Sequence, residues 1–539
     1  EIAAADRTSI DEATSIDVSS SAGIGGTAIV WSSDQTTFLG SINARGTVSG
    51  GAVEISAAND LNYVDLMRLE IGRDGYLLLD PKDIAVGVGA PYDPINDDVF
   101  YDESSSTSNV SATSLAALLT STNVVLQASN DITVTSQIIV PEEGHHLTLQ
   151  AGRSVVINSN INTANGDLTL IANDYASNGV HEEHRVGGNA AITMGNQGTF
   201  INAGTGTVTI DLRAGTGRSG NQDDAGFITL RDITAGRLSV THAGSNNATN
   251  SGNIVIEENV TISVSGQGIP GESALFMEAK AGQILIKSGA SLRSTYAGPE
   301  SFDAITLRAN LDNAATANFS GIYLDSGALI ETALNGSGNI LLEGRGGKGE
   351  GSDGRGLRLS SNAKIQSLGH GTVTLTGYGA SAGGTSRHGI LVEGAEISSA
   401  YGDISITGYG GASLHGNQTG VAITNGAKIS STGSGEEAAV ISIEGYGGVG
   451  AGALSNMRGV LMEGVGVAVE SIDGDITITG LGGPNTTSEN SFGVVIRDQA
   501  TVKTTGAARI AIEGTGGGTT DASKAYGILL ESSAVVTSE

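Results

Sequence analysis

The chain has 539 residues, no cysteine and a formal net charge of −30. Its 57 acidic residues outnumber 27 basic ones, which argues against binding to nucleic acid and to anionic membrane surfaces. No leader with a basic and then an apolar region, and no run of about 18 apolar residues, is present, so no membrane insertion is expected. The 81 glycines, the 7 prolines and a hydrophobic fraction of 39% favour stacked repeats over disorder.

The N-terminal part, residues 1–86, alternates apolar and polar residues in short runs bounded by glycine, which is typical of β-strands. Its clearest segments are GGTAIVWSSDQTTFLGSINARG (25–46), GGAVEISAANDL (50–61) and GYLLLDPKDIAV (75–86). Residues 87–122 break this pattern with prolines and a cluster of acids, and then with SLAALL. We interpret them as an acidic loop excursion followed by a short helix near 111–120.

Residues 123–319 return to strands, beginning with NVVLQASNDITV (123–134), which ends the longer segment LLTSTNVVLQASNDITV (118–134), and continuing with HLTLQAG (146–152) and DLTLIAND (167–174). The strands of the Leu-Thr-Leu type recur roughly every 21 to 23 residues, which predicts short turns of a coil. Later strands in this part are less regular in spacing.

Residues 320–539 form a regular array with a repeat of about 34 residues. A glycine followed by two apolar positions in alternation recurs at Gly321, Gly356, Gly389, Gly420, Gly459, Gly493 and Gly527. A second apolar pair follows each of these glycines, and a third element such as GDISITGYGG (402–411) or GDITITGLGG (474–483) follows that pair in most copies. Three short strands per copy cannot each bury a face alone, so the copies must stack strand on strand. The array predicts an all-β parallel β-helix of roughly 18–22 turns over the whole chain.

Four segments resemble, in sequence and in order, the middle region of filamentous-haemagglutinin-like adhesins exported by two-partner secretion. They are residues 25–46, 50–61, 75–86 and 118–134. The resemblance covers about residues 10–175. It implies a right-handed β-helical shaft of a large bacterial surface or secreted protein, with an outer-membrane transporter as partner. The family's secretion domain is missing here, so we expect this chain to be an interior segment or a processed form.

Candidate metal ligands are weak. The acidic excursion clusters carboxylates that suit a hard cation such as Ca²⁺, without an EF-hand or nonapeptide pattern; they are Asp93, Asp97, Asp98, Asp102 and Glu103. The sequence HEEH at 181–184 lacks the helical spacing of a zinc protease and lies among Gly and Asn residues, so a solvated loop is the simpler interpretation. No other cofactor is expected.

Two outward columns are predicted from the array. The fourth residue after each repeat glycine gives a polar ladder, and the residue after the glycine of the third element is Tyr378, Tyr409 and Tyr446 in three successive turns. Tyrosines in such a column pack on one another, and the functional alternative is a strip on which glycans stack.

We therefore expect an extracellular adhesive and structural shaft without catalytic activity, located at the cell surface or secreted. Its expected partners are glycan or protein receptors on host cells, neighbouring cells or matrix. Both ends of the chain lack a recognisable capping turn, so head-to-tail self-association or continuation of the chain into a fibre is also expected. The alternative is a β-helical protein that binds or cleaves polysaccharides. An enzyme of that class needs a convergent set of acids beside a basic residue, which the sequence does not reveal.

Overall fold

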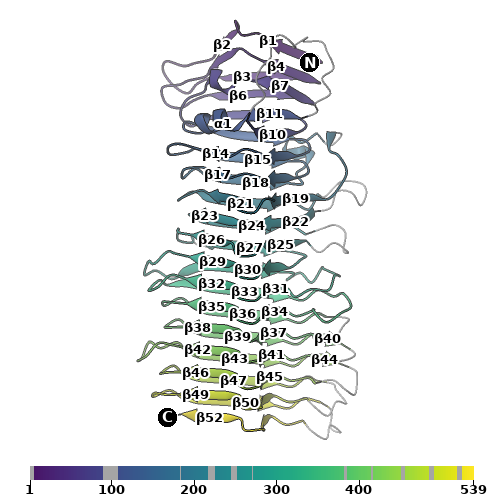
Figure 1. Cartoon of the computed structure of the whole chain (residues 1–539), viewed down its shortest axis with the longest axis vertical. Helices are drawn as coiled ribbons and strands as arrows, with labels where there is room; N and C mark the ends of the chain where they lie inside the picture. The colour runs from purple at the N-terminus through teal and green to yellow at the C-terminus, as the bar shows by residue number, and fades with distance from the viewer. Residues whose placement is uncertain are drawn as a thin grey trace. The chain divides into compact units, whose positions relative to one another are not determined.

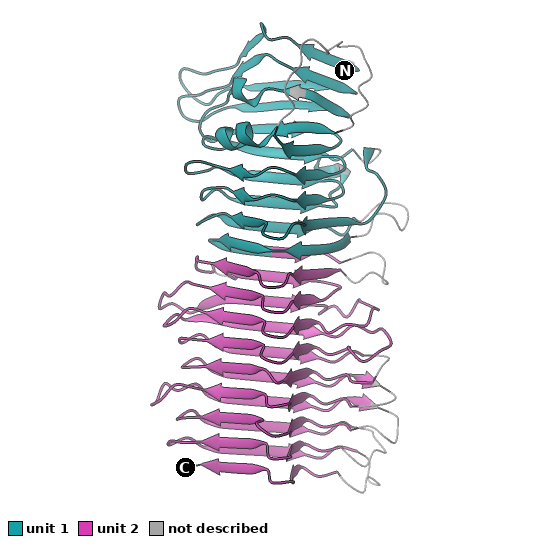
Figure 2. Ribbon diagram, viewed as in Figure 1, with its two compact units in different colours: residues 1–239 teal, residues 240–539 magenta. Residues whose placement is uncertain are grey.

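The computed structural model describes most of the chain: residues 5–88, 107–181, 184–215, 225–244, 252–269, 271–381, 385–413, 417–450, 456–484, 491–518 and 525–538. These residues form two compact units, residues 1–239 and 240–539 (Figure 2). Each unit is a parallel β-helix in which three strands per turn contribute to three sheets, called here sheets A, B and C (Figure 1). The predicted fold class is confirmed.

Unit 1 builds its sheets from successive turns. Sheet A of unit 1 contains β3 (Thr27–Ser32), β6 (Ala52–Ala57), β9 (Gly75–Asp80), β12 (Thr122–Ala128), β15 (Leu147–Ala151), β18 (Leu168–Ala172) and β21 (Thr207–Leu212). Sheet B contains β11 (Ser108–Ser111), β10 (Ile84–Gly87), β13 (Ile132–Val134), β16 (Val155–Ile157), β19 (Ala190–Met194) and β22 (Ala225–Leu230). Sheet C contains β14 (Ile138–Ile139), β17 (Ile161–Asn162), β20 (Phe200–Asn202) and β23 (Asp232–Ala235).

Smaller elements complete unit 1. Two three-stranded sheets are formed by β1 (Arg7–Ile10), β4 (Gln35–Phe38) and β7 (Asp60–Val64), and by β2 (Ser15–Asp17), β5 (Ser41–Asn43) and β8 (Leu69–Glu70). Short 3-10 turns include η1 (Leu66–Arg68) and η2 (Ala176–Asn178). The predicted short helix is confirmed as α1 (Ala112–Leu118), which begins where the Ser111 hydroxyl accepts a hydrogen bond from the Ser114 amide and which buries Leu115. No helix in the described ranges is long and apolar enough to cross a membrane.

Unit 2 repeats one pattern with little variation. Its sheet A contains β27 (Leu275–Ala279), β30 (Phe302–Ala309), β33 (Gly338–Arg345), β36 (Val373–Tyr378), β39 (Ile404–Tyr409), β43 (Ile441–Tyr446), β47 (Ile476–Leu481) and β50 (Ile510–Thr515). Sheet B contains β25 (Asn253–Ile256), β28 (Ile284–Ile286), β31 (Ile322–Leu324), β34 (Leu357–Leu359), β37 (Ile390–Glu393), β41 (Val421–Thr424), β45 (Val460–Glu463), β48 (Val494–Arg497) and β51 (Ile528–Leu530). Sheet C contains β26 (Thr261–Val264), β29 (Ser291–Ser294), β32 (Leu329–Thr332), β35 (Lys364–Ser367), β38 (Glu396–Ser399), β42 (Lys428–Ser431), β46 (Ala468–Ser471), β49 (Thr501–Thr504) and β52 (Val535–Ser538). A short pair, β40 (Ala412–Ser413) and β44 (Val449–Gly450), joins two loops.

The core of unit 2 consists of apolar columns that run from turn to turn. Leu375, Ile406 and Ile443 are paired in register on β36, β39 and β43, and none of the three is exposed to solvent. The two similar decapeptides of the sequence supply β39 and β47, which are separated in sheet A by β43 alone. They are the same strand two turns apart, as the repeat predicts.

The number of turns is smaller than expected. Sheet A has 16 strands among the described residues, counting β24 (Arg237–His242), which contains residues on both sides of the division between the units. The expected 18–22 turns are a count of strand-like segments in the sequence. The first residues of β15 and β18 are 21 positions apart (147 to 168), but those of β18 and β21 are 39 apart (168 to 207), because loops of the later turns lengthen.

The glycines that end the strands of sheet A in unit 2 are required by close backbone approach. A Cβ atom on Gly408 would lie 2.2 Å from the carbonyl oxygen of Gly420, and one on Gly445 would lie 2.1 Å from that of Gly459. Any side chain at these corners would push apart the end of a sheet A strand and the start of the next sheet B strand.

Substituting Gly408 by Ala is therefore expected to lower the free energy of unfolding by about 1–3 kcal/mol, since the added methyl group overpacks a rigid corner. Ser405→Ala, on the outward face of the same strand, is the matched control and should stay within about 0.5 kcal/mol of the wild type. Denaturant unfolding of the two variants measures the difference. Equal stabilities would contradict the close-approach explanation.

Candidate functional site

The three predicted tyrosines form a continuous stack on the outward side of sheet A in unit 2. The ring centroids of Tyr378 and Tyr409 are 5.0 Å apart with planes at 5°, and those of Tyr409 and Tyr446 are 4.8 Å apart at 8°. The Arg345 guanidinium lies 4.5 Å from the Tyr378 ring centroid, and Leu481 occupies the same column in the next turn after Tyr446. Both faces of the Tyr409 ring are thus covered by its neighbours. A sugar ring cannot stack on them, although the ring edges and hydroxyl groups remain available.

The stack has a measurable structural role. Each stacked ring pair contributes about 0.5–1.5 kcal/mol beyond its buried area, and Tyr409 belongs to two pairs. We expect Tyr409→Ala to lower the free energy of unfolding by about 1–3 kcal/mol and Tyr409→Phe, which keeps the ring, to leave it nearly unchanged. Denaturant unfolding separates the two outcomes, and a Phe variant as unstable as the Ala variant would assign the stability to the hydroxyl group instead.

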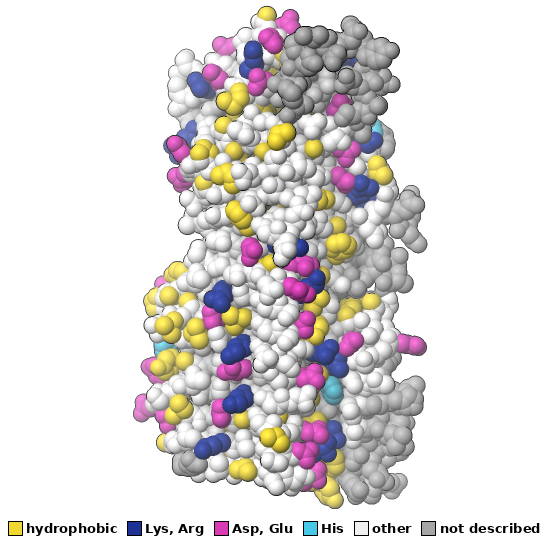
Figure 3. All heavy atoms as spheres, viewed as in Figure 1, with side chains coloured by type: hydrophobic (Ala, Val, Ile, Leu, Met, Phe, Trp, Pro, Cys, Tyr) yellow, Lys and Arg dark blue, Asp and Glu magenta, His cyan; other side chains and the backbone are white. Residues whose placement is uncertain are grey.

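Ion pairs join the C-terminal part of the predicted polar ladder on sheet B of unit 2. Arg497 lies between two glutamates, with its Nη2 atom 2.7 Å from Glu463 Oε1 and its Nη1 atom 3.6 Å from Glu531 Oε1. On sheet C, Lys364 Nζ is 2.8 Å from Glu396 Oε2. Figure 3 shows basic and acidic side chains lying next to one another on the visible face of unit 2. Opposite charges in adjacent turns avoid the repulsion that a column of like charges would cause.

The remaining candidates from the sequence do not form a metal centre in the parts that the structure describes. Asp93, Asp97, Asp98, Asp102 and Glu103 lie outside the described residues. Within the described residues, no group of three or more His, Cys, Asp or Glu side chains is placed to hold a metal ion.

The loop that contains His181 and His184 is attached to the corners of neighbouring turns. The two imidazole centroids are 5.7 Å apart. The His181 amide donates to Ser129 Oγ at 3.1 Å, and Arg185 Nε donates to the Gly152 carbonyl at 2.7 Å. Glu182 and Glu183 lie outside the described residues. The contacts that are described hold the loop against the coil.

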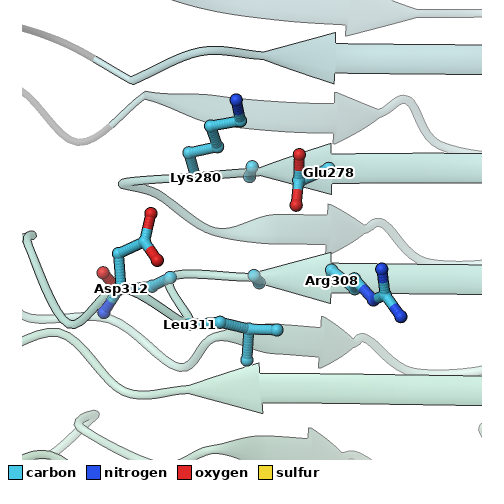
Figure 4. Close-up of a pocket in the computed structure, with 8 residues that line it drawn as sticks. Glu278, Lys280, Arg308, Leu311 and Asp312 are labelled. Carbon is cyan, nitrogen blue, oxygen red and sulfur yellow. The ribbon is translucent and has the colours of Figure 1, made fainter.

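One small hollow lies in unit 2 between the ends of β27 and β30 (Figure 4). It is bordered by Glu278, Lys280, Arg308, Leu311 and Asp312 and has a volume of about 20 Å³. Such a volume holds about one water molecule. Arg308 also pairs with Glu343 of the following turn, with its Nε atom 3.0 Å from Oε2. The hollow is too small for a sugar or a cofactor.

The outward side of sheet A in unit 1 carries a surface of different character. We call it the Trp31 face and define it as Ile29 and Trp31 on β3, Glu54 and Ser56 on β6, and Tyr76, Leu78 and Asp80 on β9. Register places Trp31, Ser56 and Asp80 in one row and Ile29, Glu54 and Leu78 in the next. The exposed fraction is 64% for Ile29, 38% for Trp31 and 40% for Tyr76. Exposed apolar side chains beside polar groups are typical of interaction sites.

The Trp31 face was not predicted, because its strand has apolar residues on both sides. In β3 the buried residues are Ala28, Val30 and Ser32, and the larger Ile29 and Trp31 point outward. The alternation alone predicts that the larger side chains, Ile29 and Trp31, lie in the core. The one signal in the sequence is that Trp31 is the only tryptophan of the chain.

The carboxyl group of Asp80 lies in an unusual environment. Its Oδ1 atom is buried and has no hydrogen-bond partner. Burial, and to a smaller extent the nearby Glu54, raises the pKa of Asp80 to about 7. Burial also raises the pKa of Tyr76, again with Glu54 and Asp80 as further causes. The Ser56 hydroxyl donates to Glu54 Oε1 at 2.8 Å. At neutral pH the Asp80 carboxyl is therefore able both to donate and to accept a proton.

Comparison with known proteins gives no relative from which to assign a function. No model of a known protein family matches the chain, and no curated protein matches it.

Proposed function

We propose that this chain is the adhesive and structural shaft of a large bacterial protein that is secreted or displayed at the cell surface, and that it acts by binding rather than by catalysis. The observation that carries the proposal is the way in which the four segments resembling filamentous-haemagglutinin-like adhesins are used. They supply β3 to β5, then β6, then β9 and β10, and then β12 and β13. The strands β3, β6, β9 and β12 are successive neighbours in sheet A, so each of the four segments contributes one of four adjacent strands.

The fold supports a role in which length and surface matter more than a single cavity. Each turn pairs with the turns before and after it, so turns can be added without changing the core. The segments between β36 and β37, β39 and β41, β43 and β45, and β47 and β48 differ in length and sequence. A constant core with variable loops suits a protein that presents binding surfaces to receptors. In this proposal an outer-membrane transporter exports the parent protein, as the resemblance implies.

A polysaccharide-binding or polysaccharide-cleaving protein is the second candidate, and the Trp31 face is the observation that favours it. Asp80 titrates near neutrality beside Glu54, as a general acid would. The two candidates differ in whether the glycan is altered after it binds.

The test uses the purified chain in two parallel assays. Beads coated with the chain are expected to attach to cultured host cells or to glycan-coated surfaces more than beads coated with an unrelated acidic protein of similar size. Incubation with a panel of soluble polysaccharides is expected to release no reducing ends above the background. Sustained release of reducing ends that is abolished in Asp80→Asn would support the polysaccharide-cleaving function over the shaft function. A lack of attachment to every surface tested would contradict the adhesive function.

A further inference from the structure

The Trp31 face has the size of a short carbohydrate site. Strands in a sheet lie about 4.8 Å apart and rise about 3.3 Å per residue, so the three strands span about 10 Å and the five positions from Tyr76 to Asp80 span about 13 Å. Trp31 and Tyr76 lie at opposite corners of this rectangle, because Trp31 shares a row with Asp80 and Tyr76 lies four positions earlier on β9. Glu54 and Ser56 lie between the two aromatic residues.

We propose that the Trp31 face binds an uncharged glycan chain, with pyranose rings resting against the Trp31 and Tyr76 side chains and sugar hydroxyls bonded to the carboxyl groups of Glu54 and Asp80. The inference rests on the proposed adhesive function and names its ligand class and one of its sites.

The aromatic residues supply the apolar part of the site. Indole and phenol rings combine a large apolar surface with a polar tip, which suits ligands that carry both C–H faces and hydroxyl groups. Trp31 and Tyr76 are 38% and 40% exposed without another ring stacked on either of them among the described aromatic contacts. The tyrosine stack of unit 2 differs in this respect, since its ring faces are covered by one another.

The carboxyl groups select for an uncharged ligand. An anionic polysaccharide would place its own carboxylate or sulfate beside Glu54 and Asp80, where no basic side chain belongs to the face. A hydroxyl group can donate to Glu54, which accepts a hydrogen bond from Ser56, and can donate to or accept from the Asp80 carboxyl, whose buried Oδ1 atom has no hydrogen-bond partner. The site therefore discriminates by charge as well as by shape.

The experiment uses the intrinsic fluorescence of the whole chain, because Trp31 is its single tryptophan and reports on this face alone. Cellohexaose, maltohexaose and hexa-N-acetylchitohexaose are the uncharged probes, and oligogalacturonate of the same length is the anionic control. We expect at least one uncharged probe to shift and quench the Trp31 emission in a saturable way. Oligogalacturonate should produce no saturable change at the same concentrations and ionic strength.

Variants then locate the site by isothermal titration calorimetry with the best uncharged probe. Trp31→Ala and Tyr76→Ala are each expected to weaken binding about tenfold or more, and Asp80→Asn by a smaller factor. Tyr409→Ala, in the tyrosine stack of unit 2, is the matched aromatic control and should bind as the wild type does. All three variants of the Trp31 face change outward side chains, and unchanged far-UV circular dichroism confirms that they are folded.

Three results would overturn the proposal: no response of Trp31 to any uncharged probe, binding that survives both Trp31→Ala and Tyr76→Ala, or tighter binding of oligogalacturonate than of the uncharged probes. Because the measurement is made on the purified chain with defined oligosaccharides, it is independent of where the protein acts. A surface location with no glycan response would reject this site and leave the shaft proposal standing.

Discussion

Replacement of Ile406 by Ala is expected to lower the free energy of unfolding of the region around β39 by about 2–5 kcal/mol. Ile406 is fully buried and is paired in register with Leu375 in the preceding turn and Ile443 in the following turn. Removing its side chain leaves a cavity inside a column of close-packed residues, and the paired backbones on either side prevent the cavity from collapsing.

Hydrogen exchange is the appropriate measurement, because each turn of a stacked protein is stabilised mainly by its neighbouring turns. A destabilised turn can therefore open locally without unfolding of the whole unit. Amides of β36, β39 and β43 should exchange faster in Ile406→Ala, while those of β27 should not change. Ser405→Ala changes the adjacent outward residue and should leave the same amides within about 0.5 kcal/mol of the wild type. A uniform loss of protection across unit 2, or an equal effect of the two variants, would contradict the description of the core as columns with local effects.

The second large effect concerns pH. The pKa of Asp80 is about 7 in the folded chain against an ordinary value of 3.8. Between these values the folded state binds a proton that the unfolded state has released, so stability falls as the pH rises. The contribution of the neutral carboxyl is complete below about pH 4 and is lost as the pH rises through 7. Its size is on the order of 2–3 kcal/mol, because the carboxyl is only partly shielded from solvent.

Asp80→Asn is expected to remove this part of the pH dependence and to be more stable than the wild type at pH 8, since the amide stays neutral. Local hydrogen exchange of β6, β9 and β12 at a series of pH values measures the effect, after correction for the intrinsic exchange rate. Glu513→Gln, an exposed residue of β50, is the control and should keep the wild-type slope. A wild-type slope that Asp80→Asn leaves intact would assign the titration to another group.

Much of unit 2 could be predicted from the sequence because glycine marks the same corner in every turn. The repeat glycines, the apolar pair after them and the Ile-x-Ile strands fall on sheets B, C and A in the register that the spacing indicates. The alternation of apolar and polar residues fixes the inward side of sheet A strands such as β39, β43 and β47, because only one side of each carries large apolar residues before the glycine.

Other features could not be predicted, because residue type alone does not determine which side of a strand is inward. Ile29 and Trp31 point outward, whereas Ser399 and Ser431 lie inside the coil in a column of hydroxyl residues on sheet C. The alternation of residue types predicts apolar residues inside the coil and serines outside it. This prediction fails where small residues such as serine fill a narrow corner of the coil.

Arg387 is the clearest of these cases. It is fully buried, and its guanidinium group donates to the carbonyl oxygens of Gly347 at 3.2 Å and Gly349 at 2.6 Å. The space for it exists because Gly354 has no side chain, since a Cβ atom there would lie 1.5 Å from Arg387 Nη1. An arginine in a glycine-rich segment of a sequence usually indicates an exposed loop. The structure shows instead that the Arg387 guanidinium is buried in the space that a side chain at Gly354 would occupy.

Location in the producing cell tests the central proposal most directly. Antibodies raised against unit 2 should label intact, unpermeabilised cells or detect the protein in the culture medium, and brief protease treatment of intact cells should remove the surface signal. That result would agree with an extracellular shaft. A protein found only after the cells are permeabilised, and protected from added protease, would contradict it.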